Sequence, residues 1–266
     1  MDLPEKADIM NTNVTNPNKT VLRIILAAAA VLILCGAFCG AAAAAGDGSE
    51  TSPYEISTAA ELTSFLTNAE DWTGQYGKII TSIDVTGGQI TVTGDVSKNL
   101  DLNGKTIKAA GGKFTYGLLN WGSSGTLTIT DSVGTSDSDK RGSISGNSKT
   151  RPLYLSGGTV NMTSGKLTGG NVGMLGGGGV YMNSGRFELS GNAGIEGNYA
   201  NGSGGGVYMN SGTFTMSGNS CIIGSTSNWG GGGVYMNSGT FTMSGNSRIS
   251  GNHQYGNEKN GGGVYV

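Results

Sequence analysis

The chain carries little charge. Only 13% of its 266 residues are Asp, Glu, Lys or Arg, and 16 basic residues against 18 acidic ones give a net charge of −2. From Gly177 to the C-terminus there are three basic and three acidic residues. Nucleic acids are held mainly through neutralisation of their phosphates, so this composition argues against a nucleic-acid partner. It argues equally against a strongly polyanionic substrate.

Cysteine and histidine are also scarce. Of the three cysteines, Cys35 and Cys39 lie in an apolar segment, and Cys221 is the only one further along the chain. A single thiol cannot form an intramolecular disulfide, so disulfides do not hold this part of the fold together. His253 is the only histidine, and its loop contains neither a cysteine nor a second histidine that would complete a metal site. We therefore expect no metal and no cofactor.

Glycine, in contrast, is abundant, with 50 residues that follow no Gly-X-Y period, which excludes collagen. The glycines punctuate a repeat: GGGVYMNSGTFTMSGNS occurs without change at Gly204–Ser220 and at Gly231–Ser247, and a similar copy begins at Gly177. Its first valine recurs at Val180, Val207, Val234 and Val264, in steps of 27, 27 and 30 residues. A fixed period of this size predicts a solenoid, in which each coil is buried by its neighbours.

Substitutions between the copies show which side chains face inward. Where one copy has Thr213 and Thr215, another has Arg186 and Glu188, whereas the intervening Phe214 is unchanged. Positions that accept charge point outward and positions that stay apolar point inward. We expect three short strands per coil and a parallel β-helix of about 27 residues per coil, all-β in class.

In such a stack, equivalent residues lie in line at about the strand spacing of 4.8 Å. The expected internal ladders are Leu153, Val180, Val207, Val234 and Val264, and Phe187, Phe214 and Phe241, with Met182, Met209 and Met236 filling the space beside them. A third short strand is expected to hold Ile195, Ile222 and Ile249. At the turn after the first strand, Asn183, Asn210 and Asn237 are expected to hydrogen-bond along the axis.

The N-terminal region indicates export. Residues 1–23 form a polar tail, and residues 24–45 contain no charge, which suits either a transmembrane anchor or a signal peptide cleaved near Ala45. Lys19 and Arg23 precede this segment, so the tail is expected in the cytoplasm and the repeats outside. Both alternatives remain open, and both place the protein at the cell surface or in the extracellular space.

Three further segments follow. Residues 46–53 are a linker, residues 54–75 a helical N-terminal cap, and residues 76–266 the β-helix repeats. In the cap, Thr58 and Glu61 have the spacing of a capping box. The apolar side chains that follow lie on one helical face, suited to cover the open edge of the first coil: Leu62, Phe65 and Leu66.

These motifs resemble the glycine-rich repeats of right-handed parallel β-helix proteins on prokaryotic cell surfaces, many of which are adhesin-like. The resemblance extends over Pro53–Val266 and rests on PYEISTAAEL, LDLNGKTI at Leu100–Ile107, GTLTITD at Gly125–Asp131 and the GGGVYM repeats. It implies a right-handed β-helix with an adhesive role. Pectate-lyase-like enzymes share this architecture, but a fold does not by itself carry an activity.

We predict no catalytic residue. A glycan-cleaving site on this scaffold would need paired carboxylates at one ladder position, but Glu188 aligns with Thr215 and Glu196 with Ile223. The best acidic pair, Asp137 and Asp139, falls in an insertion and is interpreted as part of a solvated loop.

One tyrosine per coil is expected on the outer face, and these are the candidate ligand-binding residues: Tyr154, Tyr181, Tyr208, Tyr235 and Tyr265. They could form a platform on which sugar rings stack. In the alternative, which we favour, neighbouring rings stack on one another and stiffen the sheet.

The sequence thus predicts an exported, non-enzymatic surface protein that adheres to glycans or partner proteins. A carbohydrate-active enzyme and a structural envelope component are the alternatives. The chain ends within a strand at Val266, and an uncapped coil exposes unpaired backbone. We therefore expect end-to-end self-association, a missing C-terminal part or a truncated gene product.

Overall fold

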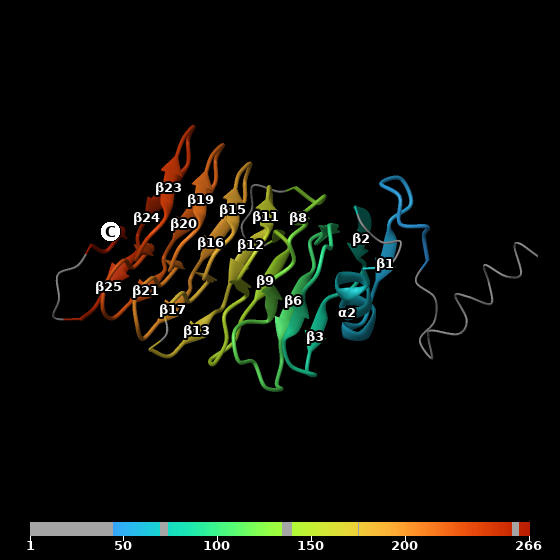
Figure 1. The fold of residues 1–266 in the computed structure, drawn as a ribbon, viewed down its shortest axis with the longest axis horizontal. Coiled ribbons are helices and arrows are strands. Elements are labelled where there is room, and N and C mark those ends of the chain that lie inside the picture. The colour runs from blue at the N-terminus through green and yellow to red at the C-terminus, as the bar shows by residue number, and fades with distance from the viewer. Residues whose placement is uncertain (1–44, 70–73, 135–139, 175, 257–260) are drawn as a thin grey trace, which may run out of the picture. The chain divides into compact units, whose positions relative to one another are not determined.

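The computed structural model describes residues 45–69, 74–134, 140–174, 176–256 and 261–266, and over these the chain winds into a parallel β-solenoid. Two of its walls are seven-stranded sheets, one strand from each of seven coils. Figure 1 shows successive coils side by side from α2 to β23. The predicted tail, and all of the 24–45 segment except Ala45, lie outside the described residues. Within the residues described, no helix is both long and apolar enough to cross a lipid bilayer.

Four parallel sheets form the described walls, numbered here in the order in which a complete coil visits them. Sheet 1 consists of β1 (Tyr54–Ile56), β2 (Gln75–Ile79), β5 (Lys98–Asp101), β8 (Thr126–Thr130), β11 (Thr159–Met162), β15 (Arg186–Leu189), β19 (Thr213–Met216) and β23 (Thr240–Met243). Sheet 2 consists of β3 (Ile83–Val85), β6 (Thr106–Ala109), β9 (Ser143–Ser145), β12 (Lys166–Thr168), β16 (Gly194–Glu196), β20 (Cys221–Ile223) and β24 (Arg248–Ser250). Sheet 3 consists of β13 (Asn171–Val172), β17 (Tyr199–Ala200), β21 (Thr226–Ser227) and β25 (His253–Gln254). Sheet 4 consists of β4 (Ile90–Val92), β7 (Leu119–Trp121), β10 (Leu153–Leu155), β14 (Val180–Met182), β18 (Val207–Met209), β22 (Val234–Met236) and β26 (Val264–Tyr265).

Sheet 3 corrects the expectation of three strands per coil, since the later coils have four. Its strands are two residues long, too short to show the alternation by which strands are found in a sequence. The first of them, β13, begins at Asn171, whose N–H donates to the carbonyl of Asn147 in the preceding coil at 3.0 Å. In the earlier coils this wall consists of loops.

The predicted ladders are confirmed. Val180 pairs in register with Val207, and Val207 with Val234, and all three are fully buried. The rings of Phe214 and Phe241 stack in the same way, with centroids 5.0 Å apart. Complete burial of such side chains removes apolar surface from water in every coil, which is the main stabilising contribution in a solenoid.

Helix α2 (Ala59–Thr67) covers the N-terminal end of the stack, next to β3 and β4. The predicted capping box is present: Thr58 Oγ1 accepts from the Glu61 N–H at 3.2 Å, and Glu61 Oε2 accepts from the Thr58 N–H at 3.0 Å. The side chains buried under it are the three expected: Leu62, Phe65 and Leu66. The helix occupies only part of the 54–75 segment because Tyr54–Ile56 forms a strand that pairs with β2.

The glycine runs mark the place where adjacent coils approach most closely. A Cβ atom added to Gly205 would overlap the carbonyl oxygens of Thr226 and Gly232. Gly204, one residue earlier, has a φ of 67°, which side chains disfavour. The repeated glycines therefore follow from backbone proximity and turn conformation.

The coil that contains β23 to β26 has no described neighbour on its C-terminal side. Phe214 is fully buried, but the residues of the last coil are not, with 39% of Met243, 39% of Val264 and 75% of Val266 exposed. No described strand pairs with the outer edge of β23. This end of the described solenoid is an apolar edge with unpaired backbone groups.

Candidate functional site

The tyrosine row consists of Tyr154, Tyr181, Tyr208, Tyr235 and Tyr265, one from each of five adjacent strands of sheet 4. All five are partly buried and lie between inward-facing neighbours, so they project outward as expected. Successive ring centroids are 5.3, 4.9, 5.1 and 5.2 Å apart, and successive planes are inclined by 10°, 13°, 12° and 13°. The rings therefore stack on one another, as in the self-stacking alternative.

Stacking leaves the ring edges and hydroxyl groups for external contacts, since an inner ring has a neighbour on each face. Within the described part of the chain, no hydrogen bond is made by any hydroxyl of the row, and none of these oxygen atoms is buried. Burial, followed by the neighbouring phenol groups, raises the pKa of Tyr154 and of Tyr208. At neutral pH these hydroxyls are therefore protonated, and each can both donate and accept a hydrogen bond.

Two residues that the sequence did not indicate complete the N-terminal end of the row. The ring of Tyr116 lies 4.8 Å from that of Tyr154, but it comes from the loop before β7, because Asn120 holds the register position. Arg151 is 4% exposed, and its guanidinium carbon lies 5.0 Å from the ring centroid of Tyr181.

Arg151 remains charged in this position. Burial lowers its pKa to about 10, with the nearby tyrosines opposing the shift, so it is protonated at neutral pH. Its Nη2 donates to the carbonyl of Gly176 at 3.0 Å. The equivalent residue in the following repeat copies is Gly178 or Gly205, and for this reason no repeat pattern could reveal the contact.

An asparagine row runs beside the tyrosine row at the ends of β14, β18 and β22. Nδ2 of Asn210 donates to Oδ1 of Asn183, and Nδ2 of Asn237 donates to Oδ1 of Asn210, both at 3.3 Å, as predicted. Sequence reasoning missed similar stacks with the same spacing: Asn192, Asn219 and Asn246, and Asn201 with Asn228. The outer face beside sheet 4 thus carries two uncharged polar rows of equal period.

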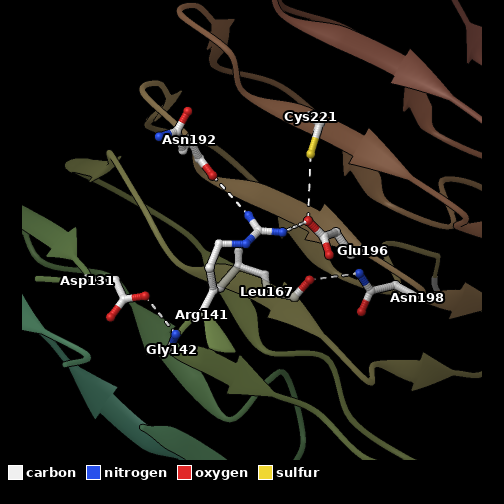
Figure 2. A network of polar contacts seen from close by, with 8 residues as sticks. All are labelled: Asp131, Arg141, Gly142, Leu167, Asn192, Glu196, Asn198 and Cys221. Atoms are coloured by element: carbon white, nitrogen blue, oxygen red, sulfur yellow. Dashed lines mark hydrogen bonds and ion pairs between the residues drawn. The ribbon is translucent and has the colours of Figure 1, made fainter. Parts of the chain in front are cut away.

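A polar network on sheet 2 ties the insertion to later coils (Figure 2). Arg141 forms an ion pair with Glu196, two coils further along, and its Nη1 donates to the Asn192 carbonyl at 2.9 Å. Gly194 leaves room for this pair, since an added Cβ would overlap the Glu196 carboxylate. At the base of the insertion, Oδ2 of the buried Asp131 accepts from the Gly142 N–H at 2.7 Å.

Cys221 joins this network without becoming reactive. Its Sγ lies 3.7 Å from Oε1 of Glu196 (Figure 2), and its side chain is 5% exposed. Burial, followed by the negative charge of Glu196, raises the pKa of the thiol. A protonated thiol is a poor nucleophile, so the group packs as a small apolar side chain.

The acidic candidates do not converge. Glu188 pairs in register with Thr215 and forms an ion pair with Arg186, and Glu196 pairs in register with Ile223. Asp137 and Asp139 lie outside the described residues. Over the described ranges, no group of three or more His, Cys, Asp or Glu residues could hold a metal ion, and His253 is exposed on β25.

A hollow of about 540 Å³ lies between two loops of adjacent coils, the loop from β6 to β7 and the loop from β9 to β10. It is lined by residues 111–115 and 147–149, including Lys113 and Lys149, both exposed. It forms because the two coils that contribute these loops have no strand in the place where β13 and its successors lie.

Comparison with known proteins finds no match to any family model, any curated protein or any solved structure. The case for function therefore depends on the surface of this chain. Its most regular chemical feature is the tyrosine row with the adjacent asparagine row, which can bind a ligand through repeated, uncharged hydrogen-bonding groups.

Proposed function

We propose that the chain is an exported, non-enzymatic surface protein that adheres to glycans or to partner proteins through the tyrosine row. Residues 24–45 would either anchor it in the membrane or be removed near Ala45. The repeats would stand outside the cell on a solenoid that we take to be right-handed, the hand found in nearly all parallel strand crossovers.

One observation carries this proposal: five identical side chains recur at about 5 Å intervals with no described partner for their hydroxyls. Stability of the sheet can account for the stacked rings but does not require a polar group at the outer edge of each. A row of equivalent groups suits a ligand that is itself repetitive, because contacts made within one complex reinforce each other.

The two alternatives are less well supported. An enzyme acting on carbohydrate would use paired carboxylates or a bound metal. Of the acidic residues on the repeats, Glu188 and Glu196 are each ion-paired with an arginine and lie opposite uncharged residues of the next coil. A purely structural envelope component would need the stacked sheets but would not need the exposed tyrosine hydroxyls.

A glycan array probed with the purified chain tests the adhesive role. We expect binding that is lost when Tyr181, Tyr208 and Tyr235 are changed together to Ala. The matched control is the triple change of Thr213, Thr215 and Thr240 to Ala, on the outer face of sheet 1, which should bind normally. Release of reducing or unsaturated sugars would instead favour the enzyme, and absence of any binding would leave the structural role.

Export is tested separately on intact cells. Protease added outside should degrade the repeats while a cytoplasmic marker survives, and the mass of the mature N-terminus should distinguish an anchor from cleavage near Ala45. Full protection of the repeats in intact cells would refute the surface location.

A further inference from the structure

The spacing of the tyrosine row restricts the kind of glycan that can use all of it. Four successive ring separations lie between 4.9 and 5.3 Å, and no step inclines the planes by more than 13°. The hydroxyl groups therefore follow a nearly straight line along the solenoid axis, with one group per coil. A ligand that contacts every tyrosine must present a polar group at the same interval.

The type of contact is restricted as well. Aromatic residues usually hold a sugar that lies flat against the face of the ring. The inner rings of the tyrosine row are stacked on both faces, so sugars cannot bind to them in this way. What remains is the row of hydroxyls and the ring edges, whose partial positive charge attracts oxygen atoms. The ligand is therefore held through its own hydroxyl and ring oxygens.

The asparagine row supplies a second line of polar groups with the same period. Within the row, Asn210 uses one N–H and one oxygen lone pair along the axis, whereas Asn183 only accepts and Asn237 only donates. Each amide therefore keeps at least one donor and one acceptor for a ligand. Sheet 4 bears no charged side chain in the five strands that carry the tyrosine row. The surface formed by the two rows is therefore suited to a neutral ligand.

We propose that the two rows bind an extended, neutral, β-1,4-linked polysaccharide lying parallel to the solenoid axis, with one sugar per coil. In such a chain both linkage bonds are equatorial, and the polymer advances per sugar by nearly one strand spacing. Successive sugars are turned by about half a turn, so they present alternate edges, each with polar oxygens, to the rows. An α-1,4-linked chain of the same sugar coils and loses the register after the first contact. This inference rests on the proposed adhesive function and specifies its ligand class.

Calorimetric titration of the purified chain tests whether the spacing of the sugars matches the spacing of the tyrosine row. The probes are β-1,4-linked oligomers of glucose and of N-acetylglucosamine, two to seven sugars long, with α-1,4-linked glucose oligomers for comparison. We expect affinity for at least one β-linked series to rise with each sugar up to five and then to level off, and no measurable binding of the α-linked series.

The variant that isolates the hydroxyls is Y181F/Y208F/Y235F, which keeps the stacked rings. It should weaken binding of the five-sugar β-linked ligand by at least about tenfold, as expected for the loss of three hydrogen bonds of modest net strength. Thermal unfolding should be unchanged, which separates loss of contact from loss of fold. The control K113A/K149A, which removes both lysines of the hollow, should bind like the wild-type chain.

The outcomes separate the two proposals. Equal binding of α- and β-linked oligomers, an affinity independent of length, or unchanged binding by the Phe variant would overturn the inference. If both β-linked series fail while other glycans bind in a tyrosine-dependent way, the inference falls and the adhesive function stands. If no glycan binds at all, this inference and the glycan-binding part of the proposed function both fail.

Discussion

The rings of Phe187 and Phe214 lie parallel in the core, with centroids 5.3 Å apart and planes inclined by 10°, although 27 residues separate them in the chain. Both are fully buried, and their strands pair in register. The same arrangement recurs along the repeats, where an inward-facing side chain packs on its equivalent in the adjacent coil.

The first prediction concerns this core. Phe214→Ala should lower the free energy of unfolding by about 3–5 kcal/mol, because the cavity lies between two other rings and cannot collapse. Phe241 occupies the same ladder in the last coil but is partly exposed, so Phe241→Ala should cost clearly less. Denaturant unfolding of both variants measures the difference, and equal losses would contradict the ladder.

The sequence was sufficient to predict these ladders because the repeats are identical over long stretches. Which residues face inward followed from single exchanges, such as Glu188 for Thr215. Features made by unrepeated residues were missed: the ion pair of Arg141 with Glu196 spans two coils, and Tyr116 joins the tyrosine row from a loop. Nothing in residue type or spacing indicates such contacts, since they depend on the path of the loops in space.

The second prediction concerns the close approach of the coils. Gly205→Ala should destabilise the chain by about 1–3 kcal/mol, because the added methyl group overlaps two carbonyl oxygens and the backbones must separate. Gly173 is a matched control, since an added Cβ there meets no atom within 4 Å. Gly173→Ala should be nearly neutral, and a comparable loss in both variants would show that the overlap is unimportant.

The third prediction concerns pH. Lys98 is 1% exposed, with its Nζ 5.3 Å from the Phe65 ring centroid, and burial lowers its pKa to about 8. The unfolded chain keeps this proton up to about pH 10.4. Between these values the unfolded state binds more protons, so the free energy of unfolding should rise as the pH rises through 8.

Lys98→Met isolates this effect. The contribution should be visible between about pH 8 and 9.5, below the range in which tyrosines titrate. Denaturant unfolding across this range should show the rise in the wild-type chain and a flatter profile in the variant. Identical pH profiles would show that Lys98 is not responsible.

The fourth prediction concerns the open edge of the last coil. We propose that a second copy of the chain pairs with this edge, covering Met243 and Val264, because unpaired strands and exposed apolar groups promote association. Sedimentation should show association that increases with concentration and is reduced in M243K/V264K. The control T215K adds charge on the outer face and should leave association unchanged. A strictly monomeric chain at high concentration would refute this pairing.

The central claim is the register of the coils, and cysteine cross-linking tests it most directly. Thr215 and Thr242 lie opposite each other in adjacent parallel strands, at a Cα separation of about 4.8 Å that suits a disulfide. In a background without other cysteines, T215C/T242C should therefore oxidise to an intramolecular disulfide in high yield. The pair T213C/T242C is displaced by two residues on the same face, beyond about 7 Å, and should not. Equal yields from the two pairs, or no cross-link in the first, would contradict the account.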